Sequence, residues 1–461
     1  MASSLSPTSL TPALKMCRRY KVGTLSGLSI LALIHFCRAD NLQTDKTGEL
    51  TVDTVSPPNH VPTANLERVT LEQSLKIATQ DNPSLKAAFA RWRGSLEKVI
   101  QARALPDPKL NYEILTQVET PEHRFGVKQE LPQFGMLKAE TDMAMQEAKA
   151  KQQMFLAEKL ALFAEVKTAF YECEYLSKAI ATEETSIQLM RDMDSGMRIR
   201  YVSSQESHTN LLRLQAEIGK MEAELKSMQS MIPLVAARLN SALGRDPSGV
   251  PFWPEPQALT VESEALSAKD LLSALDENSP EIQASREMVM AAEAQRGKAK
   301  AGYWPMVMVG VRQMRSEGGP PMGESNYPVE AMIEFSLPLN FRKNRAAVRE
   351  AEAMMEASQS EKIALRHKLA LDLKENFYYY QDALRRLGLA ENTLIPKQEE
   401  ALQSMRRTFG SGKAEYIDVV DAQRNLLAFR LMAERARADI KIRLSILERI
   451  SARSLRRGGS S

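Results

Sequence analysis

The sequence predicts a mainly α-helical protein with a small β part, built from two copies of one plan. Of its 461 residues, 43% are hydrophobic and 26% are charged, which is typical of a folded protein, and Gly (21) and Pro (22) are sparse. Ala, Leu, Glu, Lys, Arg and Met, which favour helices, dominate long stretches. A pattern near Pro83 recurs near Pro280, and each copy also contains two short strand-like segments.

The composition excludes several classes of protein. Lys+Arg 61 against Asp+Glu 58 gives a net charge of +3, which is too balanced to indicate a nucleic-acid partner. Outside the N-terminus no apolar run reaches the ~18 residues of a membrane-spanning helix. HExxH, GxxxxGK[ST] and GxSxG are absent, and the five histidines form no pair at metal-ligand spacing. We therefore predict no catalytic, cofactor-binding or metal-binding residue, and no enzyme.

The N-terminal segment has the three parts of a secretory signal. Basic residues lie at 18–21, an apolar run covers 25–36, and Cys37-Arg38-Ala39 is a small-x-small cleavage site. A retained anchor is the alternative, and a lipoprotein with lipid attached to Cys37 is a weaker one, because Phe36 is bulky where a small residue is expected. If the signal ends at Ala39, only Cys173 remains, and an exported chain without an internal disulfide must be stabilised by helix packing or assembly.

Three motif pairs place the two copies about 200 residues apart. Pro83 and Pro280 are separated by 197 residues, Leu131-Pro132 and Leu337-Pro338 by 206, and the turns at 201–204 and 409–412 by 208. Such a period is too long for a solenoid, so it indicates a duplicated domain. The divisions expected are a signal peptide at 1–39, an extended leader at 40–66, a first repeat at 67–246, a linker at 247–266, a second repeat at 267–452 and a flexible tail at 453–461.

Each repeat is expected to contain a helix, two strands, a very long helix, a turn and another helix. The strands are predicted at 110–117, 125–131, 306–312 and 329–337, the last of which alternates apolar and polar residues. The long helices are predicted at about 136–200 and 343–408, each roughly 100 Å long. From Leu211 to Leu239, apolar residues at spacings of three and four indicate a coiled-coil seam, which Pro233 should kink or interrupt.

The four predicted strands cannot close a barrel, because the smallest membrane barrels need about eight. Three identical chains would supply twelve strands. Lipid would then contact the apolar faces, while Glu113, Glu330 and Glu334 would face a wet lumen. The sequence therefore predicts a channel that crosses a bacterial outer membrane and continues as long helices into the periplasm.

The motifs also resemble those of the TolC-like outer-membrane factor family. The resemblance rests on the duplication, on the run from Phe125 to Pro132, and on Phe409-x-x-Gly412 followed by Ile417-Asp418-Val419-Val420-Asp421-Ala422. It covers about residues 68 to 452. Within the family, Ala104-Leu105-Pro106-Asp107-Pro108 and the run from Gln129 to Gly135 look most like the heavy-metal efflux branch of CzcC- and CusC-like proteins.

The resemblance implies a homotrimer in which a twelve-stranded transmembrane barrel stands above a helical α-barrel. It also implies a periplasmic adaptor and an inner-membrane pump, of the RND type in this branch, as partners, with outer-membrane lipid around the strands. The turns at Tyr201 to Ser204 and Phe409 to Gly412 would be adaptor-docking tips, and Asp418 and Asp421 would line the periplasmic aperture.

Two departures from the family pattern concern the gate. Phe409 stands where several relatives have a tyrosine, so a hydroxyl hydrogen bond is lost. In the first copy Ser204, Asn210 and Arg213 replace Gly, Asp and Asp, so that tip lacks the same anionic ring. A latch copied unchanged from relatives is therefore not expected.

Two other functions remain open from the sequence. One is a soluble coiled-coil scaffold that only oligomerises, although the alternating segment at 329–337 would serve no purpose there. The other is a duct for type I protein secretion or drug efflux instead of heavy-metal cations. The sequence favours an export duct without naming its cargo.

Overall fold

The computed structural model describes residues 67–115, 122–203, 207–255, 266–316, 329–410 and 416–453. The predicted signal peptide at 1–39 and leader at 40–66 lie outside these residues. So do two of the predicted tip residues, Ser204 and Gly412. All elements described below belong to residues 61–461, which form one compact unit.

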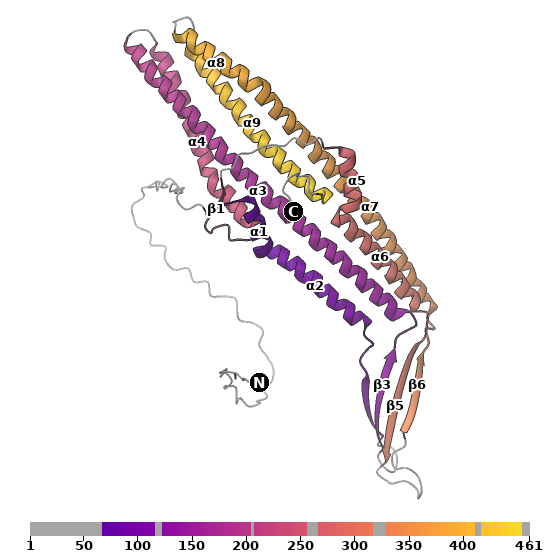
Figure 1. The fold of residues 1–461 in the computed structure, drawn as a ribbon. Coiled ribbons are helices and arrows are strands. Elements are labelled where there is room, and N and C mark those ends of the chain that lie inside the picture. The colour runs from indigo at the N-terminus through magenta and orange to yellow at the C-terminus, as the bar shows by residue number, and fades with distance from the viewer. Residues whose placement is uncertain are drawn as a thin grey trace, which may run out of the picture. The chain divides into compact units, whose positions relative to one another are not determined.

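Helices account for most of the described residues. They are α1 (Leu71–Asp81), α2 (Pro83–Arg103), α3 (Met136–Val202), α4 (His208–Ala242), α5 (Ala268–Asn278), α6 (Pro280–Ala301), α7 (Phe341–Leu389), α8 (Ile395–Gly410) and α9 (Tyr416–Ser451), with a π-helical turn, η2 (Ala390–Leu394), between α7 and α8. Helices α2, α3, α6 and α7 pack side by side in that order, α4 packs on α3, and α9 packs on α3, α7 and α8 (Figure 1).

Six strands form two sheets among the described residues. They are β1 (Glu67–Val69), β2 (Lys109–Leu115), β3 (Glu122–Leu131), β4 (Phe252–Pro254), β5 (Met306–Ser316) and β6 (Val329–Ser336). Strands β2, β3, β5 and β6 make a four-stranded antiparallel sheet in that order. This sheet lies at the opposite end of the long helices from the α3–α4 and α8–α9 connections (Figure 1). The short parallel pair β1–β4 was not predicted.

The proline motifs that revealed the duplication begin two equivalent helices. Pro83 is the first residue of α2 and Pro280 the first of α6, where a fixed φ is favourable and the missing N–H has no helical partner. Before α2, the Asn82 side chain accepts hydrogen bonds from the backbone N–H of Ser84 (2.9 Å) and Leu85 (3.3 Å), which caps the helix. The same side chain donates to the Ala242 carbonyl (3.2 Å), so the cap also ties α2 to the end of α4.

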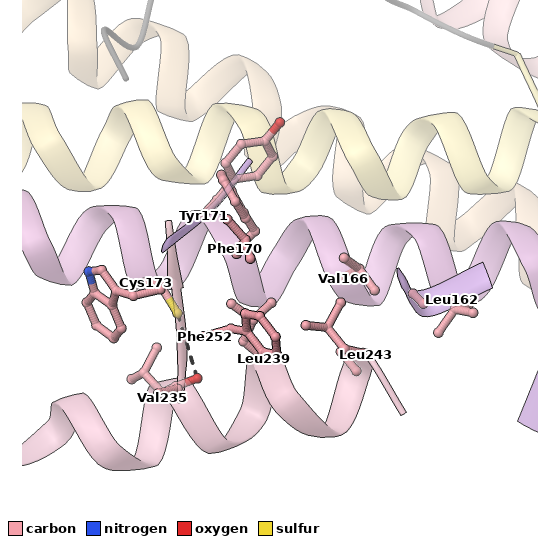
Figure 2. Packing of buried hydrophobic residues seen from close by; sticks show 14 of the residues in the cluster. Leu162, Val166, Phe170, Tyr171, Cys173, Val235, Leu239, Leu243 and Phe252 are labelled. Atoms are coloured by element: carbon pink, nitrogen blue, oxygen red, sulfur yellow. Dashed lines mark hydrogen bonds between the residues drawn. The ribbon is translucent and has the colours of Figure 1, made fainter. Parts of the chain in front are cut away.

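The first hydrophobic core lies between α3 and α4 next to β4 (Figure 2). Phe170 and Cys173 of α3 face Val235 and Leu239 of α4, and the Cys173 thiol donates to the Val235 carbonyl at 3.7 Å. Burial raises the pKa of the Cys173 thiol to about 12, so it stays protonated and packs as a small apolar group. This core holds the first long helix pair together.

The structure changes two predictions about the helices. Pro233 does not interrupt α4, which runs through it from His208 to Ala242. The predicted helix at 343–408 is one helical run, but it contains the π turn at 390–394 just before Pro396. Because Pro396 has no N–H to donate to the preceding turn, a π turn relieves the clash that a regular helix would suffer there.

The predicted fold class, mainly helical with a small β part, is confirmed by these elements. Strand β5 extends to Ser316, four residues beyond the predicted end at 312. Among the described residues, none of the helices has the length and apolar character that a membrane-spanning helix requires.

Candidate functional site

The four-stranded sheet has one charged face. Its register places Arg312 of β5 opposite Glu330 of β6, and alternation puts Glu113 of β2 on the same side. The Arg312 guanidinium donates to a Glu330 carboxylate oxygen at 2.6 Å, and another of its nitrogens lies 3.8 Å from a Glu113 oxygen. One arginine thus joins two of the predicted lumen residues across the width of the sheet.

The third predicted lumen residue, Glu334, lies on the same face. Its carboxylate is 3.7 Å from the Lys128 ammonium, and the neighbouring pair Lys109–Glu130 is joined at 3.0 Å. Glu113, Glu330 and Glu334 therefore lie on one face, and each is balanced by a cation that sequence reasoning did not assign. Because these side chains are solvent-exposed, such pairs set the local charge more than the stability.

The opposite face of the sheet is apolar and exposed in the single chain. Tyr112 and Phe125 stack there with ring centroids 4.6 Å apart, and the Tyr112 hydroxyl is 2.7 Å from Nδ1 of His123. The exposed apolar side chains on this face include Leu110, Tyr112, Ile114, Phe125, Val127, Val309, Val311, Val329, Ile333 and Phe335. An exposed, mainly apolar surface of this kind marks contact with lipid or with another molecule.

Both sides of the sheet end in an edge strand. Within the described residues β2 and β6 each pair with one neighbour only, so each leaves a row of backbone donors and acceptors without strand partners. The adjoining helices repeat this order, because α2 leads into β2 and β6 leads into α7. The sheet and the helix layer therefore have matching open edges.

The predicted aperture residues lie in the first turns of α9. Asp418 and Asp421 are three residues apart and exposed, while Val419, Val420 and Ala422 are buried, so the two carboxylates share the solvent side of the helix. Asp421 lies 3.6 Å from the Arg424 guanidinium, which is also 3.8 Å from Glu217 of α4. The sequence missed this arginine, which reduces the negative charge beside Asp421.

A contact between the two helix pairs surrounds Phe409, at the end of α8. The Arg200 guanidinium of α3 lies 4.3 Å from the Phe409 ring centroid and donates to the Phe409 carbonyl at 3.2 Å. The Phe409 ring also packs edge-on against the ring of Tyr416 of α9, and the centroids of these two rings are 5.4 Å apart. A cavity of about 200 Å³ beside these groups is also lined by Met193, Gly196, Met197, Arg406 and Val419.

Phe409 lacks the tyrosine hydroxyl of several relatives, but it contacts Arg200 of the other helix pair instead. Arg200 does not belong to any motif that the sequence analysis used. The only sequence signal was a basic residue in the last turn of the predicted helix at 136–200, where a cation also interacts favourably with the helix dipole. Its aromatic partner is 209 residues away in the chain, so only the fold reveals the pair.

The end of the first helix pair, where α3 ends and α4 begins, exposes apolar side chains. Tyr201 packs edge-on against His208, with ring centroids 5.4 Å apart. Ile199 and Val202 of α3 and Leu212 of α4 are exposed there. Ser204 and Gly412 lie outside the described residues, so the two tips can be compared only through their flanking helices.

No group of three or more His, Cys, Asp or Glu side chains suited to a metal ion occurs in the part of the chain that the structure describes. The charged face of the sheet and the two helix ends are therefore the candidate functional surfaces. Their groups can attract or repel ions and offer contacts to other chains, and none is arranged as a nucleophile with an activating base.

Comparison with known proteins places these surfaces in a family. Residues 75–245 and 271–453 match the outer membrane efflux protein family. The cobalt-zinc-cadmium resistance protein CzcC of Cupriavidus metallidurans is 23% identical over 367 residues, which cover 79% of this chain and 85% of CzcC. A solved structure of CusC superposes with a TM-score of 0.71 at 17% identity, covering 84% of this chain and 93% of that one.

The open state of the MtrE outer membrane channel of Neisseria gonorrhoeae is similar too, with a TM-score of 0.71 at 18% identity over 85% of this chain and 91% of MtrE. The predicted relationship to TolC-like proteins is confirmed by the family match, which covers both halves of the chain. The chain belongs to the outer membrane efflux protein family, and it is a non-enzymatic channel protein of tripartite efflux systems that lies in the bacterial outer membrane and extends into the periplasm.

Proposed function

We propose that three copies of this chain close into one export duct for heavy-metal cations, served by a periplasmic adaptor and an inner-membrane pump of the RND type. The observation that carries the proposal is the four-stranded sheet with two open edges, one charged face and one apolar face. Pairing β6 of one copy with β2 of the next three times gives a closed barrel of twelve strands without free edges. The division into repeats at 67–246 and 267–452 is part of this proposal.

The helices support the same closure. Helices α2 and α7 form the outer members of the helix layer, and each exposes large apolar side chains in the single chain: Phe89, Leu96 and Ile100 on α2, and Met354, Ile363, Leu371 and Tyr378 on α7. If α2 of one copy packs against α7 of the next, these side chains are buried at the same interface that joins the strands. Burial of apolar surface would then stabilise the trimer.

Closure also assigns the two faces of the sheet. The apolar face contacts outer-membrane lipid, and the face with Glu113, Glu330 and Glu334 lines a wet lumen. At the far end, Asp418 and Asp421 constrict the periplasmic aperture, so threefold symmetry gives a narrow throat with six carboxylates. The ends that include Tyr201, Ser204, Phe409 and Gly412 dock the adaptor.

The decisive experiment measures assembly and conductance together. The purified chain is extracted in detergent, its mass is determined by light scattering, and it is inserted into planar bilayers. We expect a trimer with discrete ion-conducting steps. A monomer, or recovery of the chain in the soluble fraction without detergent, would instead support the coiled-coil scaffold.

The heavy-metal cargo is supported by the likeness to CzcC, a cobalt-zinc-cadmium resistance protein. Deleting the gene in its host should lower tolerance to such cations, and the plasmid-borne wild-type gene should restore it. A deletion that leaves metal tolerance unchanged but impairs drug tolerance or secretion of a protein would favour the drug-efflux or type I secretion duct. Co-purification of the adaptor and pump would identify the partners.

A further inference from the structure

Basic side chains on the apolar face of the four-stranded sheet occur in one row only. The register places His123 of β3 directly opposite Arg315 of β5, and alternation puts both on the side that carries Phe125 and Val311. On this face the described strands contain no carboxylate and no other ionisable side chain except the Tyr112 phenol. An apolar surface that ends in two basic groups and no acid suits a molecule with an apolar body and an anionic head.

The two basic side chains lie at the end of the apolar face that is remote from the helices. At the other end, where the sheet meets the helices, Phe134 and Trp304 are exposed, and their ring centroids are 6.2 Å apart. From Met306 to Arg315 the backbone of β5 advances about 30 Å, which a strand tilt of about 35–45° reduces to about 21–25 Å across a membrane. The apolar band of a membrane barrel is about 25 Å tall. The row with His123 and Arg315 therefore lies at the level of the outer lipid headgroups.

Aromatic side chains border the basic row on its apolar side. Tyr112 and Phe125 occupy the next row of the sheet, and both are exposed. Aromatic residues collect at the boundary between hydrocarbon and headgroups. The Tyr112 hydroxyl lies 2.7 Å from Nδ1 of His123, and the two rings stack with centroids 6.1 Å apart. When the hydroxyl donates to Nδ1, the imidazole proton is on Nε2, from which it can be donated to an oxygen acceptor.

A phosphate group matches this pair in charge and geometry. A guanidinium can donate two parallel hydrogen bonds to phosphate oxygens, and such charge-assisted bonds are strong. Opposite residues of an antiparallel pair have Cα atoms about 4.5–5.5 Å apart, so His123 and Arg315 can both reach one tetrahedral group. The outer leaflet of a bacterial outer membrane is built from glycolipids whose sugars carry phosphates. Basic groups at headgroup level bind lipids of this kind.

We propose that His123 and Arg315 bind a phosphate group of lipid A, the phosphorylated glycolipid of the outer leaflet, on the outer surface of the channel. The assignment of the apolar face to lipid rests on the proposed function. Because β3 and β5 are the two inner strands of the sheet, the site is complete within one chain and lies away from the edges that would join neighbouring copies. The acyl chains of the bound lipid then cover the exposed side chains of Phe125, Val127 and Val311.

Binding is measured by titrating the purified full chain in detergent with diphosphorylated lipid A and counting bound lipids by native mass spectrometry. The test variant is H123Q/R315Q. The matched control is K109Q/K128Q, which removes two basic side chains from the opposite face of the same sheet. Phosphatidylglycerol and inorganic phosphate are titrated in parallel, to separate the glycolipid from other sources of phosphate.

We expect the wild type and the control to bind lipid A equally, and the test variant to bind it at least tenfold more weakly. Equal binding of lipid A by the test variant and the wild type would overturn the proposal. Binding of phosphatidylglycerol or inorganic phosphate to these two residues as tightly as lipid A would overturn it as well. R315K keeps the charge but not the planar guanidinium, so its affinity should lie between those of the wild type and the test variant.

A second measurement uses the wild-type chain alone, because substitutions in a sheet can impair folding. Its melting temperature is compared in the presence of lipid A and of lipid A from which a phosphatase has removed both phosphates. The intact lipid should raise the melting temperature more, because a ligand that binds only the folded chain stabilises it. Equal melting temperatures with the two lipids would overturn the proposal.

Failure of this proposal is distinguishable from failure of the proposed function. A conducting trimer without phosphate-dependent binding of lipid A would leave the duct intact and remove this site. Binding of lipid A that depends on His123 and Arg315, in a chain that forms no channel, would support the site and remove the duct.

Discussion

The two long helical hairpins of this chain share a plan but differ in continuity. In the first, α3 is a single run of 67 residues, from Met136 to Val202. In the second, the corresponding run contains the π turn at Ala390–Leu394, which ends two residues before Pro396. π turns inside helices are frequent at functional sites. The long helix of the first hairpin is therefore a regular α-helix throughout, whereas that of the second hairpin is interrupted by a π turn.

The first hairpin also contains a buried carboxyl side chain. Glu183 of α3 is 1% exposed, and neither carboxylate oxygen has a hydrogen-bond partner among the described residues. In the second hairpin, Glu391 of the π turn and Glu399 of α8 are accessible to solvent and meet arginines of α9, Arg437 and Arg430, the latter at 2.7 Å, much as Glu222 meets Arg191 in the first. Surface pairs of this kind contribute little to stability, whereas burial of an unpaired carboxylate is costly.

The largest expected effect tests the difference in rigidity directly. Leu239 of α4 and Leu373 of α7 are both fully buried, one in each hairpin. Truncating either to alanine should lower the free energy of unfolding by about 2–5 kcal/mol. We expect Leu239→Ala to lie near the upper end of this range, because Leu239 packs against the uninterrupted helix α3, which relaxes less around a cavity. Leu373→Ala should lie near the lower end. Denaturant unfolding followed by circular dichroism measures both, and equal losses would contradict the comparison.

The second prediction concerns the unpaired carboxyl of the first hairpin. Burial, and to a smaller extent Glu224, raises the pKa of Glu183 from 4.5 to about 7. Between these two pH values the folded chain holds a proton that the unfolded chain has released, so stability falls as pH rises from about 4.5 to about 7 and is constant above. Glu183→Gln should remove this loss and stabilise the protein at pH 8 by about 1–3 kcal/mol.

The neighbouring residue supplies the control for this measurement. Glu184→Gln makes the same change in charge at an exposed position, where the side chain accepts only a long hydrogen bond from Gln229 (3.4 Å). Its melting temperature should follow the wild type across the pH range. A Glu183→Gln variant whose advantage over the wild type is the same at pH 4 and pH 8 would show that folding does not raise the pKa of Glu183.

Much of this fold could be predicted from the sequence, because its signals are local and repeated. Pro83 and Pro280 begin equivalent helices, and the alternation at 329–337 marks β6, which ends at Ser336. Alternation also placed Glu330 and Glu334 on one face. The π turn could not be predicted with the same certainty, because Pro396 alone does not determine whether a helix kinks, ends or inserts an extra residue.

The residues that sequence reasoning missed are those whose partners are distant in the chain. Arg200 and Phe409 meet because two hairpins pack together, and Arg424 joins Asp421 to Glu217 of α4.

The third prediction addresses the contact that joins the hairpins at their ends. Replacing Arg200 with alanine removes both the cation–π contact with Phe409 and the hydrogen bond to its carbonyl. We expect the free energy of unfolding to fall by about 1 kcal/mol, because the end of α8 in the second hairpin loses its contact with α3 of the first. For the same reason the channel should open more frequently in planar bilayers. Arg200→Lys keeps the charge but not the planar guanidinium, so it should lie between the wild type and alanine.

The smallest effect on stability, and the clearest on conduction, is expected at Asp418 and Asp421. Each acid near the start of α9 contributes about 0.3–1 kcal/mol through the helix dipole, so Asp→Asn changes there should be nearly neutral for folding. Asp421 is partly neutralised by Arg424 at 3.6 Å, whereas Asp418 forms no ion pair within the described residues. If both line the aperture, Asp418→Asn should therefore raise single-channel conductance and lower cation selectivity more than Asp421→Asn. Glu72→Gln with Asp81→Asn, which removes two exposed acids from α1, is the control, and conductance equal to that of this control would remove the two aspartates from the throat.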